Sequence, residues 1–228
     1  MGSEDLHHKR KARKGAALER QKTERAQSPR FLIVCEGTKT EPNYLKELVN
    51  DLMIRPQVVK IAPNSGSSPD RILEHATELY DEDASHGDSF DRVFCVFDRD
   101  THMTFNATVQ RIRDLAKAAR PRPFEAITSA PCFEYWLLLH FGYTDVPFHA
   151  AGKKSVCDNL IKVLRTKPDF EAYGKGQSGI YGLLKNKTPT AIEAARKSRA
   201  TAAASGQTDP HTHVDALIEA LQELATKR

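Results

Sequence analysis

Short apolar runs alternate with helix-spaced apolar residues along the first half of the chain. The runs are rich in β-branched and aromatic residues, as in buried strands, and they occupy residues 31–35, 58–61, 92–97 and 124–128. Between them, apolar residues recur at helical spacing after Thr40 and over 70–80 and 104–119. Buried strands that alternate with amphipathic helices predict an α/β fold, with a mainly parallel sheet and helices on both of its faces.

The second half of the chain is more helical. A strongly apolar stretch over 132–141 contains two markedly polar residues, Glu134 and His140. Further helices are predicted over 152–165, 189–204 and 212–227. No internal repeat and no clear linker divides the chain. We therefore expect one domain over 30–228 whose C-terminal part, about 142–228, is helical.

The N-terminal segment differs from the rest of the chain in charge. Residues 1–30 contain nine Lys or Arg and four Asp or Glu, a net charge of +5, whereas the whole chain carries +4. Low hydrophobicity and high charge predict a basic, flexible arm over 1–29. Such an arm can speed encounter with nucleic acid by attracting phosphates. The alternative is a solvated leader without a partner.

Hydropathy and cysteine usage argue against several classes of protein. The longest apolar run is far short of the ~20 residues that a helix needs to cross a bilayer. The N-terminus lacks the apolar stretch of a secretory signal, so we expect a cytoplasmic protein without membrane contact. The cysteines form no CxxC pair, which argues against a zinc knuckle and against a disulfide framework. They are Cys35, Cys95, Cys132 and Cys157.

Acidic residues follow two of the predicted buried strands. Glu36 and Glu41 come after the first strand, and Asp98 and Asp100 come after the third. If these strands are neighbours in a parallel sheet, the four carboxylates converge at the edge where such sheets bind ligands. Without a cation these carboxylates would repel one another. Oxygen ligands suit Mg²⁺ or Mn²⁺, and a pair of such ions can promote a phosphoryl displacement. The alternative is that these acids only end strands and cap helices.

Five blocks of sequence go beyond these patterns. They are 31–44 (FLIVCEGTKTEPNY), 96–100 (VFDRD), 129–141 (SAPCFEYWLLLHF), 173–175 (YGK) and 209–214 (DPHTHV). The first three closely resemble motifs of the RloB-like family of prokaryotic defence proteins, and the last two are similar to weaker blocks of that family. The resemblance covers residues 30–225, and its motifs are specific in order and spacing.

This resemblance implies a Toprim-like fold and a nuclease related to the OLD nucleases, from abortive-infection systems that include an ABC/AAA-type ATPase. In Toprim sites, a Glu after the first strand and a DxD pair after a later strand hold the metal ions. The matching positions in this chain are Glu36, Asp98 and Asp100. Glu41 matches the second acid of the EG-x-x-x-E pattern in the OLD-like branch. Thr101-His102 stands where relatives often have another acid, so the third acidic position is either missing or supplied by Glu134.

Other polar residues are candidates for the same site. A carboxylate in an apolar stretch is costly unless it is paired or bound to metal, so Glu134 is either a site residue or half of a buried ion pair with an arginine. Lys175 lies on a glycine-containing loop and would stabilise the transition state, as a late lysine does in related OLD nucleases. The alternative for Lys175 is a plain surface lysine. We predict that substrate contacts Lys39, Arg99 and Ser129, although Ser129 is equally consistent with a turn residue.

The histidines are weaker candidates. His140 is favoured as a hydrogen-bonded core residue over a catalytic one. His7-His8 and His211-Thr212-His213 lack companions at metal-ligand spacing and are predicted to be solvated surface.

Three functions are compatible with these observations. The first is an endonuclease that cleaves RNA or DNA during phage infection, with Mg²⁺ or Mn²⁺ held by the four acids. Transfer RNA is one possible target. The second is a non-catalytic sensor that binds nucleic acid or a phage protein and docks on an ATPase. Primase-like nucleotidyl transfer would use the same metal chemistry, but the sequence shows no zinc-binding or helicase segment to support it.

Overall fold

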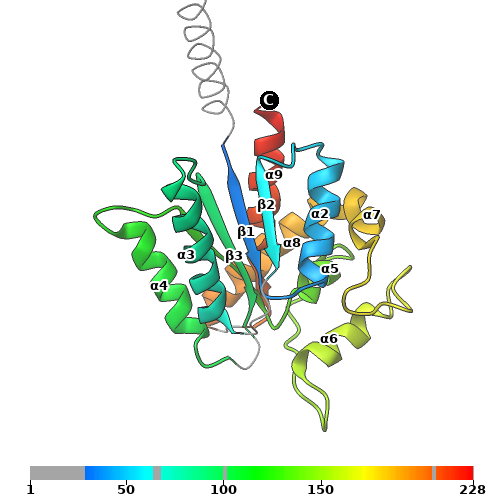
Figure 1. Ribbon diagram of the computed structural model, residues 1–228. Coiled ribbons are helices and arrows are strands. Elements are labelled where there is room, and N and C mark those ends of the chain that lie inside the picture. Colours follow the sequence, from blue (N-terminus) through cyan, green and yellow to red (C-terminus); the bar gives the residue numbers. More distant parts are fainter. Residues whose placement is uncertain (1–28, 64–67, 100–101, 207–208, 228) are drawn as a thin grey trace, which may run out of the picture.

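The computed structural model describes residues 29–63, 68–99, 102–206 and 209–227, and its centre is a five-stranded sheet (Figure 1). The strands are β1 (Phe31–Cys35), β2 (Val59–Pro63), β3 (Arg92–Asp98), β4 (Phe124–Ala130) and β5 (His211–Thr212). Their order is β2-β1-β3-β4-β5, in which β5 alone is antiparallel to its neighbour. The prediction of an α/β fold with a mainly parallel sheet is confirmed, and the arrangement is consistent with a Toprim-like fold.

Helices pack on both faces of the sheet (Figure 1). One face is covered by α3 (Pro69–Ser85) and α4 (Phe105–Lys117). The other is covered by α2 (Thr40–Asp51), α5 (Glu134–Leu139), α8 (Thr188–Ser205) and α9 (Val214–Thr226). Further helices pack against these: α6 (Val156–Leu164), α7 (Ile180–Leu184) and the 3₁₀ helix η1 (Lys185–Lys187). Among the described residues, no helix combines the length and the apolar character that a membrane span requires.

The central strand β1 shows why its sequence is a continuous apolar run. Leu32 and Val34 face the hydrophobic core beneath α3 and α4, whereas Phe31, Ile33 and Cys35 face the core on the other side. Successive side chains of a strand point to opposite faces, so a strand with both faces covered needs an apolar residue at every position. All five residues of β1 are buried.

The C-terminal region departs from the predicted elements at the edge of the sheet. The helix predicted over 212–227 begins at Val214, because Thr212 pairs with Ser129 in an antiparallel bridge between β5 and β4. A strand of two residues carries no detectable hydrophobic period, and β5 was therefore not predicted. The basic arm predicted over 1–29 lies, except for its last residue, outside the described residues.

Two of the four cysteines are bonded to each other. Cys132, just before α5, forms a disulfide with Cys157 in α6, whereas Cys35 and Cys95 are free and buried. The expectation of no disulfide framework is corrected for this one pair. The two sulfur atoms meet because α5 packs against α6, a tertiary contact that cysteine spacing does not encode.

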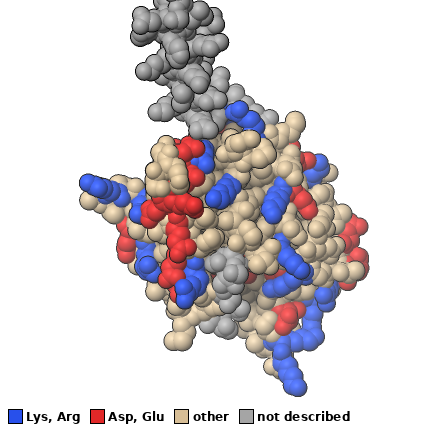
Figure 2. All heavy atoms as spheres, in the orientation of Figure 1, with Lys and Arg blue, Asp and Glu red and all other residues tan. Residues whose placement is uncertain are grey.

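Charged side chains are unevenly distributed on the face shown in Figure 2. Acidic side chains gather over α3, whose exposed acids are Glu74, Glu78, Asp81 and Glu82, while Lys and Arg are dispersed over the rest of this face. An acidic surface repels phosphates. The exposed surface of α3 is therefore unfavourable for binding an anion.

Candidate metal site at the carboxyl end of the sheet

Glu36 joins the ends of the two central strands, β1 and β3. Its backbone N–H donates to the carbonyl oxygen of Val96 at 2.9 Å, and its Oε2 accepts a hydrogen bond from the backbone N–H of Asp98 at 2.8 Å. The strands are parallel neighbours, so the residues that follow them meet at one edge of the sheet. The predicted convergence of acids from these two strands is therefore present for Glu36 and Asp98.

Glu41 lies in the first turn of α2 and crosses close to the backbone of Gly37. Its side chain is buried, with 7% of the residue exposed. A Cβ added at Gly37 would lie only 2.2 Å from Oε2 of Glu41. The glycine of the EG-x-x-x-E pattern thus provides the space for its second acid.

Burial and mutual repulsion raise the pKa of two of these carboxyls. Loss of hydration, together with the charges of Glu134 and Glu36, raises the pKa of Glu41 to about 7, against the opposing effects of a backbone hydrogen bond and of Lys175. Burial, followed by the charges of Glu41, Glu134 and Glu36, also raises the pKa of Asp98 well above its usual value. A bound cation would compensate both the lost hydration and the repulsion. The all-oxygen donor set fits Mg²⁺ or Mn²⁺.

Glu134, the first residue of α5, is buried at the same site, with 2% of its surface exposed. The hydroxyl of Tyr173 donates to its Oε1 at 3.2 Å, and Nζ of Lys175 lies 3.8 Å from its Oε2. The Oε2 atom also lies 3.4 Å from the sulfur of Cys157. The charged partner of the buried Glu134 is therefore Lys175, whose side chain is 56% exposed, and not an arginine.

The loop that carries Lys175 is attached to the start of α2. The N–H of Gly176 donates to Oγ1 of Thr40 at 2.8 Å, and Nδ2 of Asn43 donates to the carbonyl oxygen of Gly176 at 3.1 Å. Gly176 has a φ of +81°, and a Cβ there would lie 3.0 Å from the side chain of Lys39. Lys39 occupies the N-cap position of α2, and the Thr40 hydroxyl accepts the hydrogen bond from this loop.

These groups line one pocket of about 290 Å³. Its lining residues are Glu36, Gly37, Thr38, Lys39, Thr40, Glu41, Asp98, Glu134, Lys175 and Gly176. The pocket therefore brings together most of the site residues predicted from the sequence. Asp100 lies outside the described residues, so its place at the site stays a prediction.

Two predicted substrate contacts do not line this pocket. Nη1 of Arg99 pairs with Oδ1 of Asp209 at 3.2 Å, and its guanidinium lies 5.9 Å from the centre of the Phe105 ring. Ser129 is buried, and its Oγ lies 3.0 Å from Oγ1 of Thr212. Ser129 is therefore a strand residue that joins β4 to β5, neither a turn residue nor a side chain accessible to substrate.

His102 and Tyr173 are site residues that the sequence did not single out. Nε2 of His102 lies 3.3 Å from Oε1 of Glu36 and forms an ion pair with it when protonated. His102 comes two residues after the D-R-D motif, and Tyr173 precedes the Gly-Lys pair of the Lys175 loop. The sequence signals were that Tyr173 belongs to the 173–175 block and that His102 stands where relatives often have another acid, but neither residue was assigned a role.

The other histidines differ in their environment. His140 is buried with Nδ1 3.0 Å from the carbonyl oxygen of Trp136, and burial lowers its pKa to about 4, which confirms the core interpretation. The prediction of solvated surface for residues 211–213 is wrong, because they lie at the β5 edge of the sheet and Thr212 is buried. His7 and His8 lie outside the described residues.

The chain belongs to the RloB-like protein family. The family model matches residues 31–221, a range that includes every residue of the acidic pocket. Neither the curated proteins nor the solved structures include a significant match to the chain. The family resemblance seen in the sequence is thus confirmed, while the implied relation to Toprim and OLD nucleases stays an expectation.

Proposed function

We propose that this chain is a metal-dependent endonuclease that cleaves phosphodiester bonds in RNA or DNA by Toprim-type chemistry. The observation that supports the proposal is the convergence of four carboxylates and a lysine in one pocket. They are Glu36, Glu41, Asp98, Glu134 and Lys175. A cluster of acids at the carboxyl end of a parallel sheet suits cations that in turn bind a phosphate.

Each residue has a distinct role in this proposal. Glu36, Glu41 and Asp98 would hold the ions, together with Asp100 as expected from the sequence. Two bound Mg²⁺ or Mn²⁺ ions supply an activated water and charge stabilisation for the displacement. Lys175 donates to a phosphate oxygen as negative charge develops, and Glu134 and the loop contacts to α2 keep its ammonium group at the pocket. Lys39 binds a phosphate at the rim.

The biological setting follows from the family resemblance. We propose that the enzyme is an effector of antiviral defence that acts beside an ABC/AAA-type ATPase. As the substrate we favour RNA over DNA, and transfer RNA is one target that we consider. These two statements rest on analogy and not on site geometry.

The test is a cleavage assay with the purified full-length chain. Total RNA, transfer RNA and plasmid DNA are incubated with EDTA, Mg²⁺ or Mn²⁺, using wild type, Glu36→Gln, Asp98→Asn and the control Glu193→Gln, an exposed residue of α8. We expect metal-dependent cleavage that falls by at least about 10²-fold in both site variants and is unchanged in the control. Equal cleavage by Glu36→Gln would overturn the proposal.

A wild-type protein that cleaves none of the substrates requires one further experiment. The assay is then repeated with the partner ATPase and a phage lysate. Cleavage under these conditions identifies an enzyme that needs activation. Binding of nucleic acid without cleavage, and independent of metal, supports the non-catalytic sensor instead.

A further inference from the structure

A second, larger groove lies between α4 and the β5 edge of the sheet. Its volume is about 850 Å³, within the range of pockets that hold small ligands. Its floor is apolar and includes Phe105, Val109, Phe124 and Ala126. A floor of this kind favours a flat, uncharged ring system over a hydrated ion.

The rim of the groove carries positive charge. Arg99 and Arg113 contribute to it, and His211 and His213 also line the groove, where burial lowers the pKa of His213 to about 4. Glu125 is the only acid among the described residues of the lining, and both of its carboxylate oxygens accept hydrogen bonds from Arg92, at 2.7 and 2.8 Å. The groove therefore combines an apolar floor with a rim that attracts anions.

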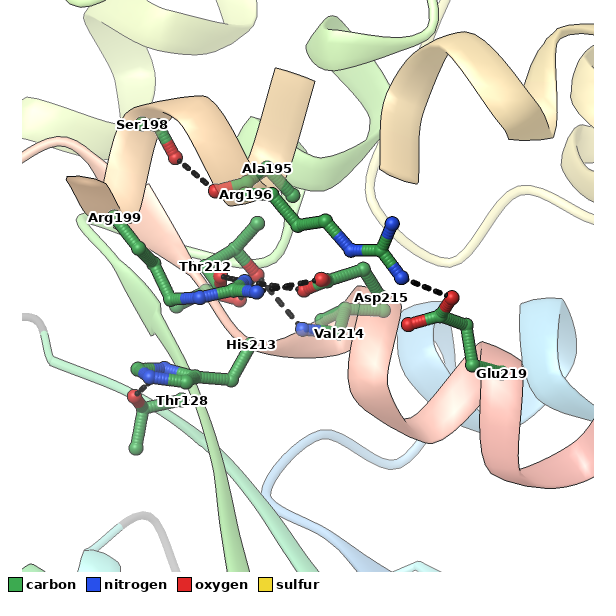
Figure 3. Close-up of polar contacts among 11 residues, drawn as sticks. Thr128, Ala195, Arg196, Ser198, Arg199, Thr212, His213, Val214, Asp215 and Glu219 are labelled. Atoms are coloured by element: carbon green, nitrogen blue, oxygen red, sulfur yellow. Dashed lines mark hydrogen bonds and ion pairs between the residues drawn. The ribbon is translucent and has the colours of Figure 1, made fainter. Parts of the chain in front are cut away.

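A buried ion pair fixes the β5 side of this groove (Figure 3). Arg199 of α8 makes two hydrogen bonds to Asp215, one of 2.7 Å from Nη2, and also donates to the carbonyl oxygen of Thr212. The adjacent His213 is held with Nδ1 3.0 Å from Oγ1 of Thr128. The guanidinium of Arg199 is thus committed to the protein, and its contacts hold the strand that places His211 and His213 at the rim.

Adjacent residues at the end of β3 line the acidic pocket and the groove. Asp98 lines the acidic pocket, and the next residue, Arg99, lines the groove. Successive side chains of a strand point to opposite faces, and neighbouring Cα atoms are about 3.8 Å apart. The two sites therefore lie on opposite faces of the sheet at its carboxyl edge, and a polymer that passes over this edge from one face to the other would contact both.

We propose that this groove binds one nucleotide of the substrate strand, adjacent to the phosphate that lies in the acidic pocket. The base packs on the apolar floor, with His213 at its hydrogen-bonding edge, and the anionic backbone lies along Arg99 and Arg113. The strand is unpaired at this point, because only an unstacked base can enter the groove. The inference rests on the proposed function, since the acidic pocket must hold a phosphate of the same strand.

Binding, measured without catalysis, tests the groove. A short fluorescent single-stranded RNA is titrated with full-length protein in EDTA at low salt, with adenosine monophosphate in a parallel titration. Ala203→Trp would fill the groove, whereas Ala204→Trp places the same side chain at an exposed position of α8 that does not line it. Arg113→Glu is compared with Arg111→Glu, since both residues are exposed on α4 and only Arg113 lines the groove.

We expect the two groove variants to bind the RNA at least about tenfold more weakly and the two controls less than about twofold more weakly. Circular dichroism checks that all four variants are folded. Equal affinity within each pair overturns the inference. The inference is also overturned if Ala203→Trp loses binding of adenosine monophosphate but keeps binding of RNA. The groove would then bind a free nucleotide and not the RNA strand.

The same variants separate this inference from the proposed function. If RNA binding depends on the groove but the protein cleaves nothing, even with its partner, the groove is kept as an RNA-binding site and the proposed nuclease activity is rejected. If neither metal-dependent cleavage nor RNA binding changes in Ala203→Trp and Arg113→Glu, the proposed nuclease activity is kept and the groove is rejected as a binding site for the substrate strand.

Discussion

The carboxylate Oε2 of Glu36 accepts a hydrogen bond from the backbone N–H of Asp98 at 2.8 Å, across 62 positions of the sequence. This oxygen stabilises the junction between β1 and β3. The other oxygen lies 3.3 Å from Nε2 of His102. Glu36 therefore combines a structural role with the proposed binding of metal, and substitutions can separate the two roles.

Glu36→Gln retains an acceptor oxygen for the Asp98 N–H but loses the negative charge. We expect its free energy of unfolding without metal to stay within about 1 kcal/mol of wild type, whereas Glu36→Ala lowers it by about 1–3 kcal/mol. Mg²⁺ should raise the melting temperature of wild type and of neither variant. Thermal unfolding with and without Mg²⁺ measures both effects, and equal stabilisation of Glu36→Gln by Mg²⁺ would exclude the carboxylate as a ligand.

The raised pKa of Glu41 predicts how stability depends on pH. The pKa is about 7 in the folded protein against 4.5 for an ordinary Glu, so the folded state binds this proton more tightly than the unfolded state. Glu41 should therefore lower the stability of the metal-free protein as pH rises from about 4.5 to about 7, by up to roughly 3 kcal/mol, while His140 and His213, whose pKa burial lowers to about 4, act in the opposite direction. Asp98 acts in the same direction as Glu41, since its pKa is also raised.

Glu41→Gln should remove the Glu41 contribution, so the difference in stability between this variant and wild type should change with pH, whereas the exposed control Glu193→Gln should follow the wild-type profile. Mg²⁺ should cancel the loss in wild type, because a bound cation favours the ionised carboxylates. Urea unfolding between pH 4.5 and 8 measures the effect. Identical pH profiles of wild type and Glu41→Gln in the absence of metal would contradict the assigned environment of Glu41.

Gly37→Ala tests the close approach of Glu41 to the backbone. The added Cβ would lie 2.2 Å from Oε2 of Glu41, so the carboxylate must leave its position. We expect Mg²⁺ to bind at least about tenfold more weakly, because displacement of a ligand group weakens a metal site. Isothermal titration with Mg²⁺ gives the affinity.

Gly182→Ala is the matched control, since a Cβ at this α7 position has no neighbour within 4 Å. Its Mg²⁺ affinity should equal that of wild type, and its stability should be slightly higher because alanine favours a helix by about 0.5–1 kcal/mol. Equal Mg²⁺ affinity in both variants would show that the position of the Glu41 carboxylate does not matter for the metal.

The ion pair of Arg199 with Asp215 is expected to stabilise the β5 edge far more than the nearby pair of Arg196 with Glu219 (Figure 3). Asp215 is 1% exposed, whereas Arg196 and Glu219 are 57% and 36% exposed. Asp215→Ala should lower the free energy of unfolding by about 3 kcal/mol or more, because it leaves a partly buried guanidinium uncompensated. Glu219→Ala should cost less than about 1 kcal/mol. Chemical denaturation compares them, and equal losses would contradict the role given to burial.

The parts of the fold that carry a local signal could be predicted. The apolar run of β1 and the helical spacing in α2 follow from periods of two and 3.6 residues, which a chain displays over a few turns. The convergence of Glu36 with Asp98 could also be expected, because acids after neighbouring parallel strands meet at one edge. The sequence therefore determined the class of fold and the main acids of the site.

The tertiary structure decided the contacts that have no local signal. Lys175 reaches the acids because Gly176 bonds to Thr40, 136 positions away, and the sequence left both a site lysine and a surface lysine open. The pairing of Ser129 with Thr212, and the bond between Cys132 and Cys157, likewise depend on how distant elements pack. Such contacts are selected by the burial of the whole core, whereas a sequence pattern reports only which face of its own strand or helix is buried.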